Sequence, residues 1–353
     1  MILIFFLLGI ENSFCLKAKS SPLDASVPEN ILPISFLFSP TLYIALFSTC
    51  GGVTSSDGLT WKDLPASSFP NCANINGAVY GNGQFVAVGV PSSGSCGIWS
   101  SSDGATWTQR TCANSQTVAP TAIEYTSQGF LAGSSGIGPP ACPIQSSTDG
   151  SSWTQLTGPC TGGTQTTNAI TESIRGKFFM STSNIISLYA ANNPAGPWNL
   201  FSPTVTSYKL TKGFNGNVYV FGFDGGGGYS AFQMSADDTT WSSSAATHAS
   251  FPSAFSYAAM GGDLFVGVVT ACSYAVFRNQ GTAFDSSITT INSSTCIPMG
   301  WGGLVYNQKA GAFVGGGNAA NAIMAFSRSA EPNDWTLNTI SATGVIKAIA
   351  FRP

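Results

Sequence analysis

The chain has 353 residues, enough for one large domain or two ordinary domains. Only 8% of the residues are charged, against about 25% in a typical soluble protein, and 43% are hydrophobic. Because there is no run of about 20 apolar residues and no cluster of basic residues to offset the net charge of −3, we expect neither a transmembrane helix nor a nucleic-acid partner.

The N-terminus begins with the apolar run MILIFFLLGI, which has the length of the hydrophobic region of a signal peptide. No basic residue precedes the run and no small-x-small cleavage site is evident, so a mis-assigned start or a buried strand remains the alternative. We interpret residues 1–20 as a signal peptide or hydrophobic leader and residues 21–40 as an N-terminal segment. We therefore expect a secreted, extracellular protein with no membrane span beyond this leader.

A repeat fills residues 41–353. An aromatic residue closes each unit, at Trp61, Trp107, Trp153, Trp198, Trp241, Phe284 and Trp335. A glycine followed by a short apolar stretch, such as GQFVAVG from residue 83 or GAFVGGG from residue 311, recurs in phase with these aromatics. Repeats of 40 to 50 residues that each hold four short strands are typical of a β-propeller. We therefore predict an all-β, seven-bladed propeller of four-stranded antiparallel blades.

The clearest units share a turn of the form Ser-x-Asp-Gly-x-x-Trp, which we call the box. Its aspartate can accept backbone N–H bonds, its glycine can take a left-handed conformation, and its tryptophan can pack between sheets. A fourth copy, SADDTTW, has Asp238 in place of the glycine, and the remaining copies are degenerate. The predicted structural residues are Ser55, Asp57, Gly58, Trp61, Ser101, Asp103, Gly104, Trp107, Ser147, Asp149, Gly150, Trp153, Asp237 and Trp241.

These repeats resemble the Asp-box, or BNR, repeats of the sialidase superfamily. The resemblance implies that the boxes form hairpin turns on the face away from the usual substrate site. It also implies a three-arginine clamp, a tyrosine–glutamate pair and an acid/base aspartate, with an early Phe-Arg-Ile-Pro motif. That motif is absent and the chain has only five arginines, so the sialidase catalytic set is not reproduced.

The ring of blades needs a closing strand. The C-terminal stretch GVIKAIAFRP resembles the inner strand of a blade, and we expect residues 345–351 to complete blade one. The alternative is residues 31–38, ILPISFLF, which Pro33 interrupts.

Eight of the nine cysteines flank boxes, and the ninth, Cys15, lies in the leader. If each box is a hairpin turn, the flanking cysteines lie at similar heights on adjacent strands. This predicts the pairs Cys50–Cys72, Cys96–Cys112, Cys142–Cys160 and Cys272–Cys296 and an oxidising compartment. There is no Cys-x-x-Cys spacing and only one histidine, so we expect no metal site and no cofactor.

Candidate ligand-binding residues are few. Glu124 and Glu172 fall on predicted inner strands of adjacent blades, but a one-residue offset from the next glycine points them to opposite faces. Asp224 and Tyr229 bound the glycine-rich stretch DGGGGY, and Trp301 begins an inner strand. An aromatic residue at a channel mouth could stack on a sugar, although core packing is the more common role for any single one. No catalytic residue can be named.

A complete repeat array without a complete catalytic set favours binding over catalysis. We therefore expect a monomeric binding module for a glycan or an extracellular protein. The alternative is a divergent glycoside hydrolase of sialidase-superfamily type, which needs two carboxylates about 5 to 10 Å apart.

Overall fold

In the computed structural model, the described residues between 41 and 353 form successive antiparallel β-sheets, with one short 3-10 helix among them, η4 (Ala66–Ser68). The structure describes residues 41–93, 96–112, 119–137, 142–160, 164–182, 187–201, 205–212, 218–224, 230–235, 237–240, 257–261, 264–270, 273–280, 283–284, 289–292, 301–317, 323–330, 334–340 and 344–353. Over these ranges, no helix is long and apolar enough to span a bilayer. The predicted leader, residues 21–40 and the rival strand at 31–38 lie outside them.

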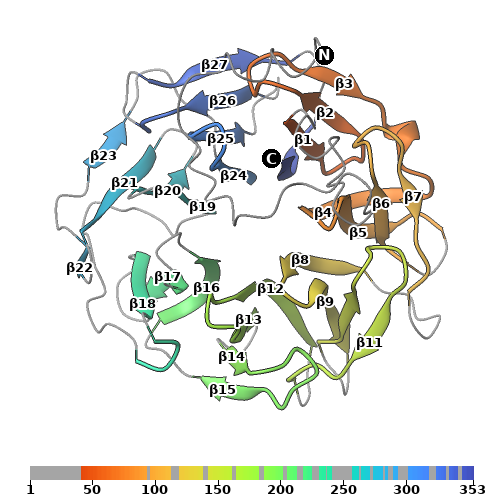
Figure 1. Ribbon diagram of the computed structural model, residues 1–353, viewed down its shortest axis with the longest axis vertical. Helices are drawn as coiled ribbons and strands as arrows, with labels where there is room; N and C mark the ends of the chain where they lie inside the picture. The colour runs from red at the N-terminus through yellow and green to blue at the C-terminus, as the bar shows by residue number, and fades with distance from the viewer. Residues whose placement is uncertain are drawn as a thin grey trace, which may run out of the picture. The chain divides into compact units, whose positions relative to one another are not determined.

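The sheets follow one another around a ring in chain order (Figure 1). One four-stranded sheet comprises β1 (Leu42–Phe47), β2 (Gly52–Ser55), β3 (Lys62–Leu64) and the C-terminal β28 (Ile346–Arg352). The next comprises β4 (Cys72–Gly81), β5 (Gln84–Pro91), β6 (Ile98–Ser101) and β7 (Thr108–Gln109).

An eight-stranded sheet follows. It comprises β8 (Pro120–Thr126), β9 (Gly129–Ile137), β10 (Ile144–Ser147), β11 (Thr154–Leu156), β12 (Thr164–Glu172), β13 (Phe178–Thr182), β14 (Ser187–Ala191) and β15 (Asn199–Phe201). Its two halves are joined where the first residues of β12, Thr164–Thr166, pair with the last residues of β9.

The remaining sheets complete the ring. They comprise β16 (Val205–Lys212), β17 (Val218–Asp224) and β18 (Ser230–Ser235); then β19 (Tyr257–Gly261), β20 (Leu264–Thr270), β21 (Ser273–Gln280), β22 (Ala283–Phe284) and β23 (Thr289–Asn292); and finally β24 (Trp301–Asn307), β25 (Ala312–Gly317), β26 (Ile323–Ser327) and β27 (Thr336–Thr339). The strands β28, β4, β8, β12, β16, β19 and β24 contact one another in this cyclic order, and we call them the inner strands.

The two ends of the ring meet in one sheet. β28 pairs antiparallel with β1, in a register that places Leu42 opposite Arg352 and Ala45 opposite Ile349. The C-terminal strand thus occupies the inner position beside β1 for which the sequence offered two candidates.

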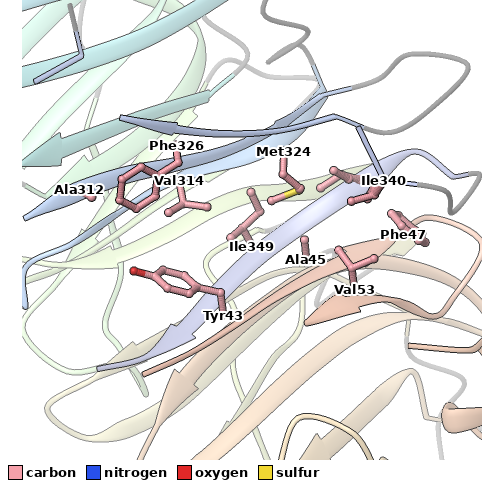
Figure 2. Close-up of a cluster of buried hydrophobic side chains, with 11 residues drawn as sticks. Tyr43, Ala45, Phe47, Val53, Ala312, Val314, Met324, Phe326, Ile340 and Ile349 are labelled. Atoms are coloured by element: carbon pink, nitrogen blue, oxygen red, sulfur yellow. The ribbon is translucent and has the colours of Figure 1, made fainter. Parts of the chain in front are cut away.

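The core lies between the sheets. Along β1, Tyr43, Ala45 and Phe47 pack against β25 and β26, as Figure 2 shows, whereas Ile44 and Leu46 join a cluster around Phe85 and Trp99. β1 is therefore buried on both faces, which explains why its sequence is a continuous apolar run and does not alternate.

The boxes of the first three sheets have one hydrogen-bonding pattern. At residues 101–107, the Asp103 carboxylate accepts the backbone N–H groups of Ala105 and Thr106, both at 2.8 Å, and Ser101 Oγ accepts the Gly104 N–H at 2.8 Å. Gly104 has a φ of 75°, and Trp107 is 3% exposed and stacks on Phe69 at 4.6 Å between ring centres. The same bonds recur at residues 55–61 and 147–153, so each turn is held by its own side chains.

A different aspartate completes the last box. Ala330 stands at the glycine position with a φ of 57°, and its N–H donates to Ser327 Oγ. The accepting carboxylate comes from Asp334, which receives the N–H groups of Arg328 and Ser329 at 2.8 and 2.7 Å. The sequence had suggested that this copy was degenerate. The bond from Ala330 to Ser327 matches the other boxes, whereas the carboxylate accepts the N–H groups that precede Ala330 and not those that follow it.

Among the described residues there are three disulfides, Cys50–Cys72, Cys96–Cys112 and Cys142–Cys160, each joining the two cysteines that flank one box. They close loops of 16 to 22 residues, which stabilise the fold by about 3 kcal/mol each in the chain-entropy model. The expected pair Cys272–Cys296 and the box residue Trp241 lie outside the described residues.

The box carboxylates make stability depend on pH. Backbone N–H donation, first from Thr60, lowers the pKa of Asp57 from 3.8 to about 2. Because the folded-state pKa is the lower one, the bonded carboxylate stabilises the fold above pH 3.8, and this contribution is lost as the pH falls through about 2. Asp57→Asn should therefore weaken the pH dependence of the free energy of unfolding between pH 4 and pH 2, by at most about 1 kcal/mol after solvent screening.

Urea unfolding at several pH values measures this effect. Asp63→Asn on the exposed strand β3 is the control for the loss of one negative charge. An unchanged pH dependence in Asp57→Asn would mean that the box hydrogen bonds contribute nothing to acid sensitivity.

Asp238 links two neighbouring sheets. It occupies the glycine position of its box with a φ of 62°, and its side chain is only 4% exposed. Arg175 Nη2 lies 2.6 Å from Asp238 Oδ1, Ser173 Oγ donates to Oδ2, and Lys177 Nζ donates to the Asp238 carbonyl oxygen at 3.0 Å. These partners come from the segment between β12 and β13. The Asp238 side chain thus makes charged contacts at the position where a side chain at Gly104 would meet Leu42 and Ile44.

Two substitutions at Asp238 separate backbone strain from the ion pair. Both Asp238→Gly and Asp238→Ala remove the carboxylate, but only alanine keeps a Cβ at positive φ. We expect Asp238→Ala to be about 1–2 kcal/mol less stable than Asp238→Gly in urea unfolding. Equal losses would show that the contacts with Ser173 and Arg175 determine the stability and that the backbone conformation does not.

Candidate functional site

The inner strands surround a channel, and most of them carry a one-residue β-bulge at a similar height. In β4 the extra residue is Asn76, in β8 it is Thr121, in β12 it is Asn168, and in β28 it is Lys347. In β24 the shift falls between Trp301 and Leu304. A bulge breaks the alternation of the strand and redirects a side chain, which is why bulges often occur beside functional sites.

A cavity of about 260 Å³ lies at the level of these bulges. Its lining includes Asn76, Thr121, Asn168, Gly303 and Lys347, together with Glu124. We call this part of the channel the polar section. It holds charged and amide groups in a space large enough for several water molecules or a small ligand group.

Two of the bulge side chains join neighbouring blades. Asn76 Nδ2 donates to the carbonyl oxygen of Pro120 at 2.9 Å, and Thr121 Oγ1 donates to that of Thr167 at 2.6 Å. In both cases the acceptor is the residue immediately before the bulge residue of the next inner strand. These bonds hold successive inner strands in register around the channel.

A second cavity, of about 530 Å³, continues the channel toward the box turns. β4 runs from Cys72 to Gly81, and Phe85 on the next strand pairs with Ser101 at the start of a box. The end of β4 that lines this cavity therefore lies at the same end of the ring as the box turns. Its lining is mainly apolar and includes half-exposed Val79, Tyr80, Ile123, Tyr125, Val305 and Phe351. We call it the apolar section.

Glu124 and Glu172 have different environments. Glu124 lies on β8 and lines both sections of the channel. Glu172 lies at the end of β12 and is 6% exposed; its carboxylate accepts hydrogen bonds from the backbone N–H and the hydroxyl of Ser127. In the strand register Glu172 is opposite Phe178, just as Tyr125 is opposite Phe130 on the neighbouring blade. Glu172 therefore occupies the position of a packed tyrosine and does not pair with Glu124.

The other sequence-predicted residues are only partly placed. Trp301 begins β24 and Asp224 ends β17, although their side chains are not described, and Tyr229 lies outside the described residues. The sequence did not point to Asn76, Thr121, Asn168 or Lys347. A one-residue bulge has no composition signal of its own, and polar residues such as these also occur elsewhere on the inner strands, as in TQTTNAITE of β12.

The arrangement of acidic side chains bears on metal binding and on glycoside hydrolysis. Across the described ranges, no group of three or more His, Cys, Asp or Glu side chains could hold a metal ion. Glycoside hydrolysis requires two carboxylates on either side of the sugar. Glu124 on β8 and Glu172 on β12 stand at different positions in the strand register, and Glu172 is hydrogen-bonded to Ser127. The channel therefore offers Lys347, Glu124, amides and an apolar surface, which are groups suited to binding.

No protein-family model matches the chain, and no curated protein sequence matches it. Among solved structures, YCF48 bound to a D1 peptide is 14% identical, with a TM-score of 0.55 over 85% of this chain and 84% of that one. The propeller of a nidogen/laminin complex is 8% identical, with a TM-score of 0.51 over 88% and 98% of the two chains. A virginiamycin B lyase from Staphylococcus aureus, with quinupristin, is 15% identical, with a TM-score of 0.51 over 66% and 74%. These likenesses confirm the fold as an all-β propeller.

Matched substitutions test the different environments of the two glutamates. Glu172→Gln presents an amide N–H₂ to one of the two Ser127 donors, and we expect it to lower the free energy of unfolding by about 1–3 kcal/mol. Glu124→Gln changes a half-exposed channel residue and keeps an acceptor oxygen, so it should cost less than Glu172→Gln. Thermal and urea unfolding measure both. Equal stability losses would contradict the assignment of Glu172 as a contact between blades.

Proposed function

We propose that the chain is a secreted, seven-bladed β-propeller of the Asp-box type, and that it binds a peptide segment of an extracellular partner protein in its channel. The observation that carries this proposal is the continuous channel with a polar and an apolar section. The seven inner strands in cyclic contact support one blade each. The box hydrogen bonds support the Asp-box assignment.

A peptide fits the backbone of the channel wall. β28, β4 and β24 are each the terminal strand of their sheet, so one edge of each faces the channel. Such an edge presents N–H and C=O groups that can bond an extended peptide, while pockets take its side chains. Two of the similar propellers are described in complexes with a peptide or a protein, which supports the same class of partner here.

The apolar section supplies the expected affinity. Val79, Ile123 and Val305 are only half-buried, so a ligand that covers one of them removes apolar surface from water. Each such side chain stabilises a complex by about 1 kcal/mol when its remaining surface is buried. The polar section can then orient the peptide by hydrogen bonds and charge.

Extracellular localisation is supported by the three disulfides, which persist in oxidising compartments. The low charged fraction and the net charge of −3 do not favour a highly charged partner. We expect the chain to act as a monomer, because the inner edges of the sheets face the channel and only the short outer strands present sheet edges at the rim of the ring.

Asn168→Phe tests the use of the channel. Asn168 lines the polar section and makes no side-chain hydrogen bond to another described residue, so phenylalanine should fill the cavity without breaking a contact. We expect peptides captured from an array of random 15-residue sequences to bind this variant at least about tenfold more weakly, with an unchanged melting temperature. Asn199→Phe, the same change on the exposed outer strand β15, should leave binding intact.

The alternatives have distinct outcomes in the same experiment. A glycan array and a panel of chromogenic glycosides are screened in parallel with the peptides. Capture of glycans alone would replace the peptide function with carbohydrate binding, and turnover of a glycoside would replace it with hydrolysis. Peptide binding that Asn168→Phe leaves unchanged would place the site outside the channel.

A further inference from the structure

Lys347 is the bulge residue of the strand that closes the ring. It is the unpaired residue opposite the step from Leu46 to Phe47. Its neighbours Ile346 and Ala348 are buried, whereas Lys347 is half-exposed and lines the polar section. Its ammonium group forms no hydrogen bond or ion pair with any described residue.

The other blades show what a structural residue does at this position. The side chains of Asn76 and Thr121 each donate to a backbone carbonyl of the following inner strand. In the same arrangement, the Lys347 side chain would donate to a backbone carbonyl of β4, but it makes no such hydrogen bond. A half-exposed ammonium group that bonds to no protein group gains no contact by folding, so it does not stabilise the fold. Its three N–H donors remain available to a bound ligand.

The surroundings select the chemistry of that ligand. An ammonium group attracts an anionic oxygen, and the Asn76 and Asn168 amides that line the same cavity can donate further N–H groups. Glu124 lines the same cavity, and its negative charge opposes a ligand that carries two negative charges. One positive charge with neutral donors suits a single carboxylate better than a phosphate group.

We propose that Lys347 binds a carboxylate group of the ligand, either the C-terminus of a peptide or an Asp or Glu side chain within it. This inference rests on the proposed peptide-binding function and specifies its polar contact. The adjoining apolar section would take the neighbouring apolar residues of the same peptide.

NMR of the intact protein with ¹³C-methylated lysines provides the test, since methylation keeps the positive charge. The Lys347 signal is identified as the one missing from Lys347→Gln. The probes are three tripeptides: Ac-Ala-Ala-Ala with a free C-terminus, Ac-Ala-Asp-Ala-amide, and the neutral Ac-Ala-Ala-Ala-amide. We expect saturable shifts of the Lys347 signal with one or both carboxylate peptides at millimolar concentrations and none with the neutral peptide. The peptide that acts identifies which source of carboxylate is used.

Variants and a competing anion complete the test. Lys347→Gln should weaken binding of the active peptide by about tenfold or more, whereas Lys62→Gln on the exposed strand β3 should not change it. Both variants should keep the wild-type melting temperature. No carboxylate-specific shift, or tighter binding of inorganic phosphate, would overturn the inference. If peptides captured on the array bind Lys347→Gln as they bind the wild type, the carboxylate contact is wrong while peptide binding stands; if wild type captures no peptide, the proposed function itself fails.

Discussion

Packing of one blade against the next is the constraint on which this structure depends. Each buried cluster draws its side chains from two neighbouring blades, as Tyr43 and Ala45 on β1 meet Val314 and Met324 on β25 and β26 (Figure 2). A single blade could cover only one face of its sheet, so its apolar strands are stable only within the ring. Closure of the ring by β28 on β1 is therefore a condition for stability, because an open ring would expose two apolar faces.

The contact between blades has a common form that tolerates local replacement. Gly104 and Gly150 let a box turn approach the apolar side chains of the preceding blade, whereas Asp238 fills the same position with a charge that Arg175 neutralises. Glu172 replaces the tyrosine found at Tyr125 and bonds to Ser127. Each polar replacement is accompanied by its own partners, which satisfies the requirement that buried polar groups be bonded. This pairing explains why acidic residues on inner strands are poor guides to a functional site in this chain.

The sequence predicted the propeller, the boxes and the local cysteine pairs because these depend on residue types that have few conformational alternatives. Gly58 and Gly104 adopt positive φ, and Trp107 needs a large buried contact. The blade number and the Asp-box assignment remain predictions. The channel was less predictable. Each bulge shifts the strand register by one residue, but no particular residue type is needed to form it. The sequence therefore could not show that Asn76 and Lys347 occupy equivalent bulge positions. The last box was recognised only as a degenerate copy, since its carboxylate comes from Asp334 and not from the aspartate position of the motif.

Function in a repeat protein is expected where one unit departs from the others without a structural reason. Asp238, Ala330 and Glu172 depart from the repeat, but each has contacts that restore the packing or the hydrogen bonds of its blade. Lys347 departs as well, and its ammonium group has no such contact among the described residues. Because the bulge of β28 places it on the channel wall and not between blades, its charge is available to a ligand. The strand that closes the ring on β1 thus also carries a channel-lining lysine that bonds to no other described residue.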